Sequence, residues 1–201
     1  MNDLLRFMIV SSLLAITFFS CEDEVAEDIE KEENVKELLD MLASEDYFPI
    51  HIGDSLQITE FPVRTFDALE IIEGIEYFRQ VSDHSTTWYR KTSTGKVYQK
   101  RADEDEYLRF DLSADIDEKW TYKEKAEGFT WHAKLMSKSD TVLIDDYLFT
   151  DCYRFYYDIE ETADEEHTVW LAPGIGIVRI SGQLGDSNVE CARIDDIKFC
   201  L

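Results

Sequence analysis

The chain is short of positive charge: 20 lysines and arginines stand against 44 aspartates and glutamates, giving a formal net charge of −24. Such a charge excludes nucleic-acid binding on electrostatic grounds, and it keeps the folded part away from anionic membrane surfaces. A long apolar run is also lacking. The run FMIVSSLLAITFF, residues 7–19, has thirteen residues, whereas a membrane-spanning helix takes about 20.

Metal-binding patterns are lacking as well. The four histidines lie far apart, without the spacing of a metal site; they are His51, His84, His132 and His167. The acidic runs 103–106 and 115–118 do not have the spacing of an EF-hand calcium loop, and we interpret them as solvated turns. The sequence therefore predicts no metal site and no cofactor.

The first 21 residues carry the clearest pattern. A short polar start with Arg6 precedes the apolar run, and the small residue Ser20 stands before Cys21. A charged start, a short apolar core and a small residue before a cut site are typical of a secretory signal. The position of Cys21 makes this one resemble a bacterial lipoprotein signal, in which the cysteine is acylated and the leader is removed. The resemblance implies a signal peptide over residues 1–20 and a membrane contact through lipidated Cys21. A transmembrane anchor and a cleaved leader with a free Cys21 are the alternatives.

Residues 21–46 are interpreted as a lipidated cysteine, an acidic tether and a short helix. Twelve acids and two lysines lie in residues 22–46. Glu22-Asp23-Glu24 resembles the acidic tag of surface-exported lipoproteins of Bacteroidota. That resemblance implies an outer-membrane protein displayed on the cell surface, the alternative being a solvated tether that faces the periplasm. Apolar residues recur at helical spacing in residues 34–43, which predicts a helix there and leaves residues 22–33 as the flexible part.

Residues 47–201 are predicted to form one domain, since about 155 residues can enclose a single hydrophobic core. Alternating apolar residues and turn signals predict strands over residues 75–81, 88–91, 96–99, 107–112, 128–136, 147–159, 167–171, 175–181 and 188–201. Many short strands separated by turns indicate a mainly β fold, with a curved antiparallel sheet that forms a half-barrel, a barrel or a sandwich.

The remaining cysteines are Cys152, Cys191 and Cys200. The last strand segment is predicted to be a hairpin that turns at Asp195-Asp196, which sets Cys191 opposite Cys200 at a distance that suits a disulfide. We therefore predict a Cys191–Cys200 disulfide. A bond that involves Cys152, or three free thiols, are the alternatives, because the same register places Arg193 opposite Lys198.

One motif points to catalysis. Gly53-Asp54-Ser55-Leu56 resembles the nucleophile block of the GDSL esterases, and residues 164–167 have the Asp-x-x-His spacing of the same family. The resemblance implies a nucleophilic Ser55, activated by His167 and oriented by Asp164. The rest of the family pattern is missing, since Asn188 is the domain's only asparagine and no long helices are predicted. An esterase is thus a minor alternative, and the protein is predicted not to be an enzyme.

Aromatic residues on the predicted strands are candidates for ligand binding, although aromatic residues in a β-domain commonly form its core. The candidates are Trp88, Tyr89, Trp131, Tyr153, Tyr157 and Trp170.

Several segments together resemble a broad group of Bacteroidota lipoproteins and secreted β-domains that has no established activity. These segments are residues 47–49, 88–98, 107–112, 119–120, 151–153 and 172–178. The resemblance implies a curved antiparallel sheet. We therefore expect a membrane-anchored, non-enzymatic binding module for a lipid, a glycan or a partner protein; the alternative is a structural or accessory subunit of an envelope complex.

Overall fold

The computed structural model describes residues 44–123, 128–159, 162–163 and 165–201. The predicted signal peptide, Cys21, the tether and the helix over residues 34–43 lie outside these residues, as does Asp164. No helix within the described ranges has the length and apolar character needed to cross a membrane.

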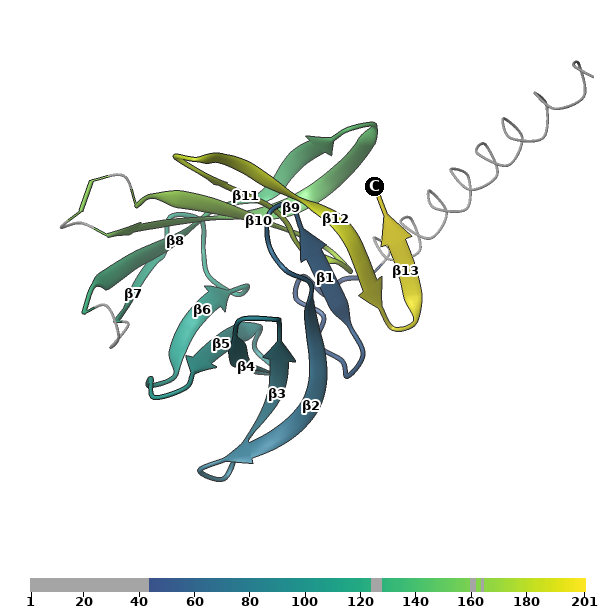
Figure 1. Ribbon diagram of the computed structural model, residues 1–201. Helices are drawn as coiled ribbons and strands as arrows, with labels where there is room; N and C mark the ends of the chain where they lie inside the picture. The colour runs from purple at the N-terminus through teal and green to yellow at the C-terminus, as the bar shows by residue number, and fades with distance from the viewer. Residues whose placement is uncertain (1–43, 124–127, 160–161, 164) are drawn as a thin grey trace, which may run out of the picture. The chain divides into compact units, whose positions relative to one another are not determined.

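The described part is a single antiparallel sheet of 13 strands, as the sequence predicted (Figure 1). The strands are β1 (Ser55–Ile58), β2 (Arg64–Ile72), β3 (Ile75–Val81), β4 (Thr86–Lys91), β5 (Lys96–Arg101), β6 (Tyr107–Asp111), β7 (Lys119–Lys123), β8 (Thr130–Ile144), β9 (Tyr147–Ile159), β10 (His167–Ala172), β11 (Gly176–Gly182), β12 (Gly185–Ile194) and β13 (Ile197–Cys200). Their order is β6-β5-β4-β3-β2-β1-β12-β11-β10-β9-β8-β7, with β13 paired to β12.

The two ends of this order, β6 and β7, meet and nearly close the curved sheet into a barrel. Side chains rather than a backbone ladder join them in the described chain. The indole Nε1 of Trp120 on β7 donates to the backbone oxygen of Leu108 on β6 at 3.0 Å. From β9, the hydroxyl of Tyr157 donates to the backbone oxygen of Arg109 at 2.7 Å. Edge-strand carbonyls that would otherwise lack partners are thereby satisfied. We call this junction the seam.

Aromatic side chains fill the interior of the barrel. Phe110 lies at its centre, with ring centroids 5.5 Å from Phe48, 5.1 Å from Phe155 and 6.3 Å from Tyr157. The buried cluster also includes Phe66, Tyr89, Val97, Tyr107, Tyr122, Ala133, Leu135, Val169 and Leu171. Burying each large apolar side chain contributes about 1.5–3 kcal/mol, so this cluster is the main source of stability.

The C-terminal hairpin has the predicted register. Cys191 pairs with Cys200, and Ile194 pairs with Ile197. Asp195 and Asp196 have φ angles of 48° and 68°, as a two-residue type I′ turn requires. Cys191 and Cys200 form the predicted disulfide across this hairpin, with their Cα atoms 4.1 Å apart, while Cys152 is free and buried.

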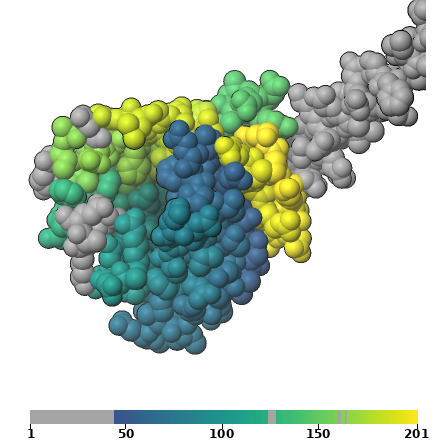
Figure 2. Space-filling view, in the orientation of Figure 1, coloured from purple at the N-terminus to yellow at the C-terminus, as the bar shows by residue number. Residues whose placement is uncertain are grey.

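A second hairpin with a similar sequence packs against the first. Residues 143–149 (LIDDYLF) connect β8 to β9, and residues 193–199 (RIDDIKF) connect β12 to β13. The ring of Phe199 lies 6.3 Å from Phe149 and 5.7 Å from Tyr147. Figures 1 and 2 agree in placing the β8–β9 tip beside β13. These contacts form a small apolar junction separate from the aromatic interior.

Candidate functional site

Arg109, on the edge strand β6, is the most unusual charged residue of the barrel. Its Nη1 donates to the hydroxyl of Tyr122 on β7 at 2.8 Å. Its guanidinium carbon lies 4.3 Å from the ring centroid of Tyr157 and 5.4 Å from that of Phe110. The guanidinium is therefore held by aromatic faces and one neutral hydroxyl, an arrangement that stabilises a cation without neutralising it.

Further aromatic rings lie around Arg109 and its ring contacts. Tyr107 stacks on Tyr122 at 4.5 Å, and Tyr122 lies parallel to Trp131 at 6.1 Å. The ring of His167 stacks on Tyr157 at 5.0 Å and meets Trp131 edge-on at 5.3 Å. We define the seam site as Tyr107, Arg109, Tyr122, Trp131, Tyr157 and His167. Strands β6 to β10 supply these six side chains, so the site exists only because the barrel closes at the seam.

The charge balance of the seam site is unusual for so acidic a chain. Two other half-buried arginines have acidic partners: Arg79 pairs with Asp67 and Glu70, and Arg90 pairs with Glu106. Among the described residues no carboxylate lies within ion-pair distance of Arg109. A partly desolvated charge without a counter-ion is costly. Arg109 is therefore positioned to attract an external anion.

Two neighbours reinforce this preference. The Nε1 atom of Trp131 is buried and has no hydrogen-bond acceptor in the described structure. Burial, together with the charge of Arg109, lowers the pKa of His167 to about 4, so the imidazole is neutral at physiological pH. Within the described ranges the site thus offers N–H donors and aromatic faces but no carboxylate, a combination that favours a carboxylate or phosphate group attached to an apolar or ring-shaped body.

The structure distributes the aromatic residues selected from the sequence over several places. Tyr89 and Tyr157 are buried in the barrel interior, and Trp131 and Tyr157 belong to the seam site. Tyr153 packs on Tyr47 with a centroid distance of 4.0 Å. Trp88 and Trp170 donate their indole N–H groups to Glu70 (2.7 Å) and Asp140 (3.1 Å), respectively. The six residues therefore do not form one surface, and their role in binding stays a prediction.

Arg109 and Tyr122 were not selected from the sequence. In the segment Tyr107-Leu108-Arg109-Phe110-Asp111 the polar residues alternate with apolar ones, a pattern that normally indicates a face in water. The closure of the barrel places this arginine beneath β7 and β9 instead. The contact between the two ends of the sheet, β6 and β7, left no local signal in the sequence.

A small hollow lined mainly by apolar residues opens elsewhere, at the end of the barrel that residues 48–56 cover. It has a volume of about 40 Å³ and is lined in part by Phe48, Arg64, Phe66 and Tyr89. This is room for a few water molecules rather than for a lipid chain or a sugar ring.

The esterase alternative finds no support in the described structure. GDSL esterases need parallel strands joined by long helices, whereas every described strand pairing is antiparallel and no described residue is helical. Ser55 begins β1, opposite Arg193 and Thr65. His167 begins β10 and stacks on Tyr157 in the seam site. No contact joins Ser55 to His167 within the described ranges.

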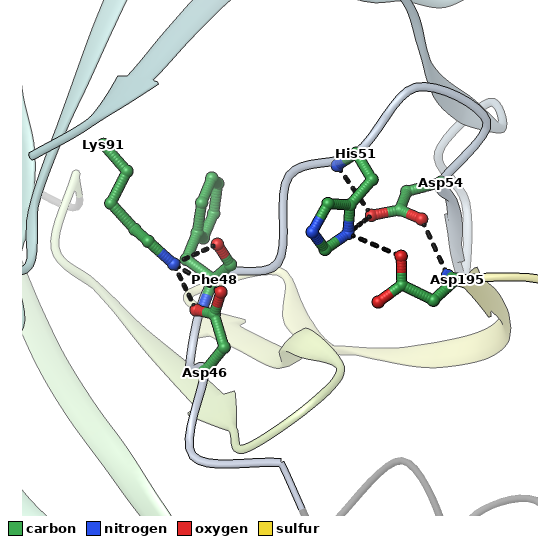
Figure 3. A network of polar contacts seen from close by, with 6 residues as sticks. All are labelled: Asp46, Phe48, His51, Asp54, Lys91 and Asp195. Carbon is green, nitrogen blue, oxygen red and sulfur yellow. Dashed lines mark hydrogen bonds and ion pairs between the residues drawn. The ribbon is translucent and has the colours of Figure 1, made fainter.

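A second polar group lies at the end of the barrel that residues 46–54 cover (Figure 3). The Nδ1 atom of His51 lies 3.1 Å from Oδ2 of Asp54 and 3.0 Å from Oδ1 of Asp195. Nearby, Lys91 forms an ion pair with Asp46 and donates to the backbone oxygen of Phe48 at 3.2 Å. We call His51, Asp54 and Asp195 the His51 cluster. This cluster was not predicted from the sequence, because Asp195 is 141 residues from Asp54.

Comparison with known proteins adds little to this geometry. No protein-family description matches the chain, and no curated protein shows significant similarity to it. Among solved structures, the chain is similar to a Parabacteroides distasonis protein described as a "putative lipoprotein", with 9% identity over 73% of this chain and 97% of the other, at a TM-score of 0.35. A likeness at this level carries no argument about function, so the proposals below rest on the residues themselves.

Proposed function

We propose that the protein is an envelope lipoprotein whose β-domain binds, without chemical turnover, a ligand that carries a carboxylate or phosphate group. The observation that carries the proposal is Arg109, held among aromatic rings and without an acidic partner among the described residues, in a chain of 44 acids and 20 bases. An anionic group at the seam site would pair with this guanidinium and accept from the orphan N–H of Trp131. The aromatic rings would cover an apolar chain or a sugar ring attached to that group.

The anchor is the second part of the proposal, and its support is the sequence of residues 1–24 alone. Two or more acyl chains on Cys21 would hold the protein firmly, because each buried methylene contributes about 0.8 kcal/mol. Cells that express the chain and are fed labelled palmitate should yield labelled protein in the membrane fraction. Cys21→Ser should abolish both the label and the membrane association. Labelled Cys21→Ser protein would overturn the anchor.

Isothermal titration calorimetry of the full chain carrying Cys21→Ser tests the binding part. The probes are decanoate, glucuronate and inorganic phosphate, each measured beside an uncharged counterpart where one exists: decanol for decanoate and glucose for glucuronate. We expect saturable binding of at least one anion and none of its uncharged counterpart. Arg109→Gln should abolish the binding.

The matched control is Arg193→Gln, because Arg193 is exposed and forms no ion pair in the described chain. That variant should bind like the parent protein. If both substitutions weakened anion binding equally, the binding would reflect only the general attraction of an anion to any arginine, which would contradict a specific site at Arg109. Binding that survives Arg109→Gln unchanged would place the ligand elsewhere and contradict the proposal.

An accessory role in an envelope complex is the second candidate, and one observation favours it. The tip of the β2–β3 hairpin exposes the apolar side chains of Leu69, Ile71 and Ile75, and 76% of the Ile71 surface is accessible to solvent. Exposed apolar groups of this kind often mark protein contacts. A photo-crosslinking residue at position 71 should capture one defined envelope protein in cells, and the same residue at the exposed position 83 should not. Equal capture at both positions would count against this role.

A further inference from the structure

The His51 cluster joins two distant parts of the chain. Asp54, with only 3% of its surface exposed, accepts from the backbone N–H of His51 on Oδ2 (2.9 Å) and from that of Asp195 on Oδ1 (3.0 Å). The imidazole Nδ1 of His51 faces Oδ2 of Asp54 and Oδ1 of Asp195, as Figure 3 shows. Three potential ligand atoms thus converge from the segment before β1 and from the β12–β13 turn.

The cluster holds more negative charge than its own partners can balance. Two carboxylates share one imidazole nitrogen, and in the described structure no lysine or arginine pairs with either of them. Lys91, the lysine drawn in Figure 3, forms its ion pair with Asp46 instead. Even a protonated His51 would offset only one of the two charges. A bound cation would remove the remaining imbalance.

The ligand types and spacing fit a transition metal. Zn²⁺ binds imidazole nitrogen and carboxylate oxygen at about 2.0–2.2 Å in a tetrahedron, whose ligands are then about 3.3 Å apart. The two N···O separations of 3.1 and 3.0 Å are close to that value. All three ligand atoms lie within 4.8 Å of one another. Only a small outward shift of the three side chains is needed to place their ligand atoms around a metal ion.

The surface next to the cluster leaves space for a further ligand. His51 and Asp195 border a hollow of about 110 Å³, whose lining also includes Ser44 and Asp46. A site with three protein ligands keeps its fourth position open to water or to another molecule. The hollow supplies both that position and a route for the ion from solvent.

We propose that His51, Asp54 and Asp195 bind a divalent transition metal of the Zn²⁺ class. His51 coordinates through Nδ1 and carries its proton on Nε2, and Asp54 and Asp195 each supply one carboxylate oxygen. Asp54 keeps its backbone hydrogen bonds, because a carboxylate has about four lone-pair positions. The metal links the beginning of the β-domain to its C-terminal hairpin and so closes a long loop of the chain, which stabilises the fold.

The test is a titration of the full chain with Zn²⁺ alone. The chain carries Cys21→Ser and no polyhistidine tag, so that neither a thiol outside the domain nor a tag binds the metal. After treatment with a chelator, the protein should bind one Zn²⁺ per chain by calorimetry, and its melting temperature should rise with Zn²⁺ concentration. Co²⁺ should give the strong visible absorption of a tetrahedral site.

The β12–β13 turn offers a matched pair of variants. Asp195 and Asp196 both have positive φ angles, which asparagine tolerates, but only Asp195 faces His51. Asp195→Asn should abolish the stoichiometric binding, the rise in melting temperature and the Co²⁺ spectrum, whereas Asp196→Asn should keep all three. His51→Gln should behave like Asp195→Asn, and the exposed His84→Gln like the parent protein. Equal Zn²⁺ binding by the two aspartate variants, or binding of Ca²⁺ that is insensitive to His51→Gln, would overturn the proposal.

Discussion

The seam site and the His51 cluster are opposite in charge. At the seam site one guanidinium is surrounded by aromatic rings and has no carboxylate partner in the described part of the chain, whereas in the His51 cluster two carboxylates share one imidazole. Several other half-buried arginines are balanced: Arg154, for example, lies 3.2 Å from Asp140. In a chain with twice as many acids as bases, a cation without an acid and acids without a cation both depart from the pattern. This difference in charge is the basis for proposing that the seam site binds an anion and that the His51 cluster binds a metal ion.

The comparison also separates stability from binding. Asp54 is buried and accepts two backbone N–H groups that would lose their partner if it were removed. Arg109 donates only one hydrogen bond within the described structure, and it is partly desolvated. We therefore expect the His51 cluster to support the fold through Asp54, and the seam site to contribute little to folding through Arg109.

The largest expected effect is that of Asp54→Ala. Two backbone N–H groups and the His51 ring lose their acceptor, which should cost about 3 kcal/mol of the free energy of unfolding. Urea denaturation measures the loss. Asp83→Ala, at an exposed turn position, is the control and should change the free energy by less than about 0.5 kcal/mol. Similar losses in both variants would remove the structural role assigned to Asp54.

The next effect concerns pH at the seam site. Burial and Arg109 lower the pKa of His167 to about 4 from its ordinary value of 6.5. Between pH 6.5 and 4 the unfolded chain therefore binds a proton that the folded chain does not, so stability falls as the pH falls through this window. The shift corresponds to a loss of about 3 kcal/mol.

His167→Phe keeps an aromatic ring and removes this titration. Between pH 6.5 and 4 the free energy of unfolding should fall less in the variant than in the parent protein, and the difference should equal the loss assigned to His167. His84→Asn serves as the control, because His84 is exposed and should leave the pH profile unchanged. Parallel pH profiles for the parent protein and His167→Phe would mean that the imidazole is not desolvated at the seam.

The smallest effect should distinguish two arginines. Arg109→Gln loses one hydrogen bond to Tyr122 but relieves a desolvated charge, so the free energy of unfolding should change by less than about 1 kcal/mol. Arg90→Gln breaks the ion pair with Glu106, which also accepts from the hydroxyl of Tyr77 at 2.6 Å, and should cost about 2 kcal/mol. A larger loss for Arg109→Gln than for Arg90→Gln would make Arg109 a structural residue.

Local patterns in the sequence predicted much of the fold. Strands β3 and β9 have the expected bounds, and the register of the C-terminal hairpin and its disulfide are as predicted. Gly174, in the turn after β10, has a positive φ of 74°, which glycine adopts without steric cost. These features depend on alternation and turn chemistry within a few residues, which a sequence displays directly.

Strands β1, β2 and β7 were not predicted, for a physical reason that β2 illustrates. There the half-buried Glu70 accepts from Arg79 and Trp88, while Leu69 and Ile71 are exposed. The usual alternation of inward apolar and outward polar residues is therefore reversed. In β9, the positive φ of Asp151 lets both Phe149 and Cys152 be buried, which strict alternation does not allow.

The two sites were harder to predict than the fold. Arg109 was hidden by a pattern that indicates an exposed face, and the His51 cluster depends on a contact between residues 141 positions apart. The seam site forms where the edge strands β6 and β7 meet, and the His51 cluster forms where residues 46–54 cover one end of the barrel. The aromatic residues that the sequence did single out include two members of the seam site, Trp131 and Tyr157, because large aromatic side chains concentrate in the core of a β-domain.

The most direct test of the central claim is a ¹H–¹⁵N spectrum of the four tryptophan indole groups. Trp88, Trp120 and Trp170 donate to Glu70, Leu108 and Asp140, whereas Trp131 has no acceptor in the described structure. Titration with decanoate or glucuronate should shift the Trp131 resonance saturably, leave the other three nearly unchanged, and have no effect in Arg109→Gln. Four resonances that stay fixed with every anion, or a Trp131 shift that persists in Arg109→Gln, would contradict an anion site at the seam.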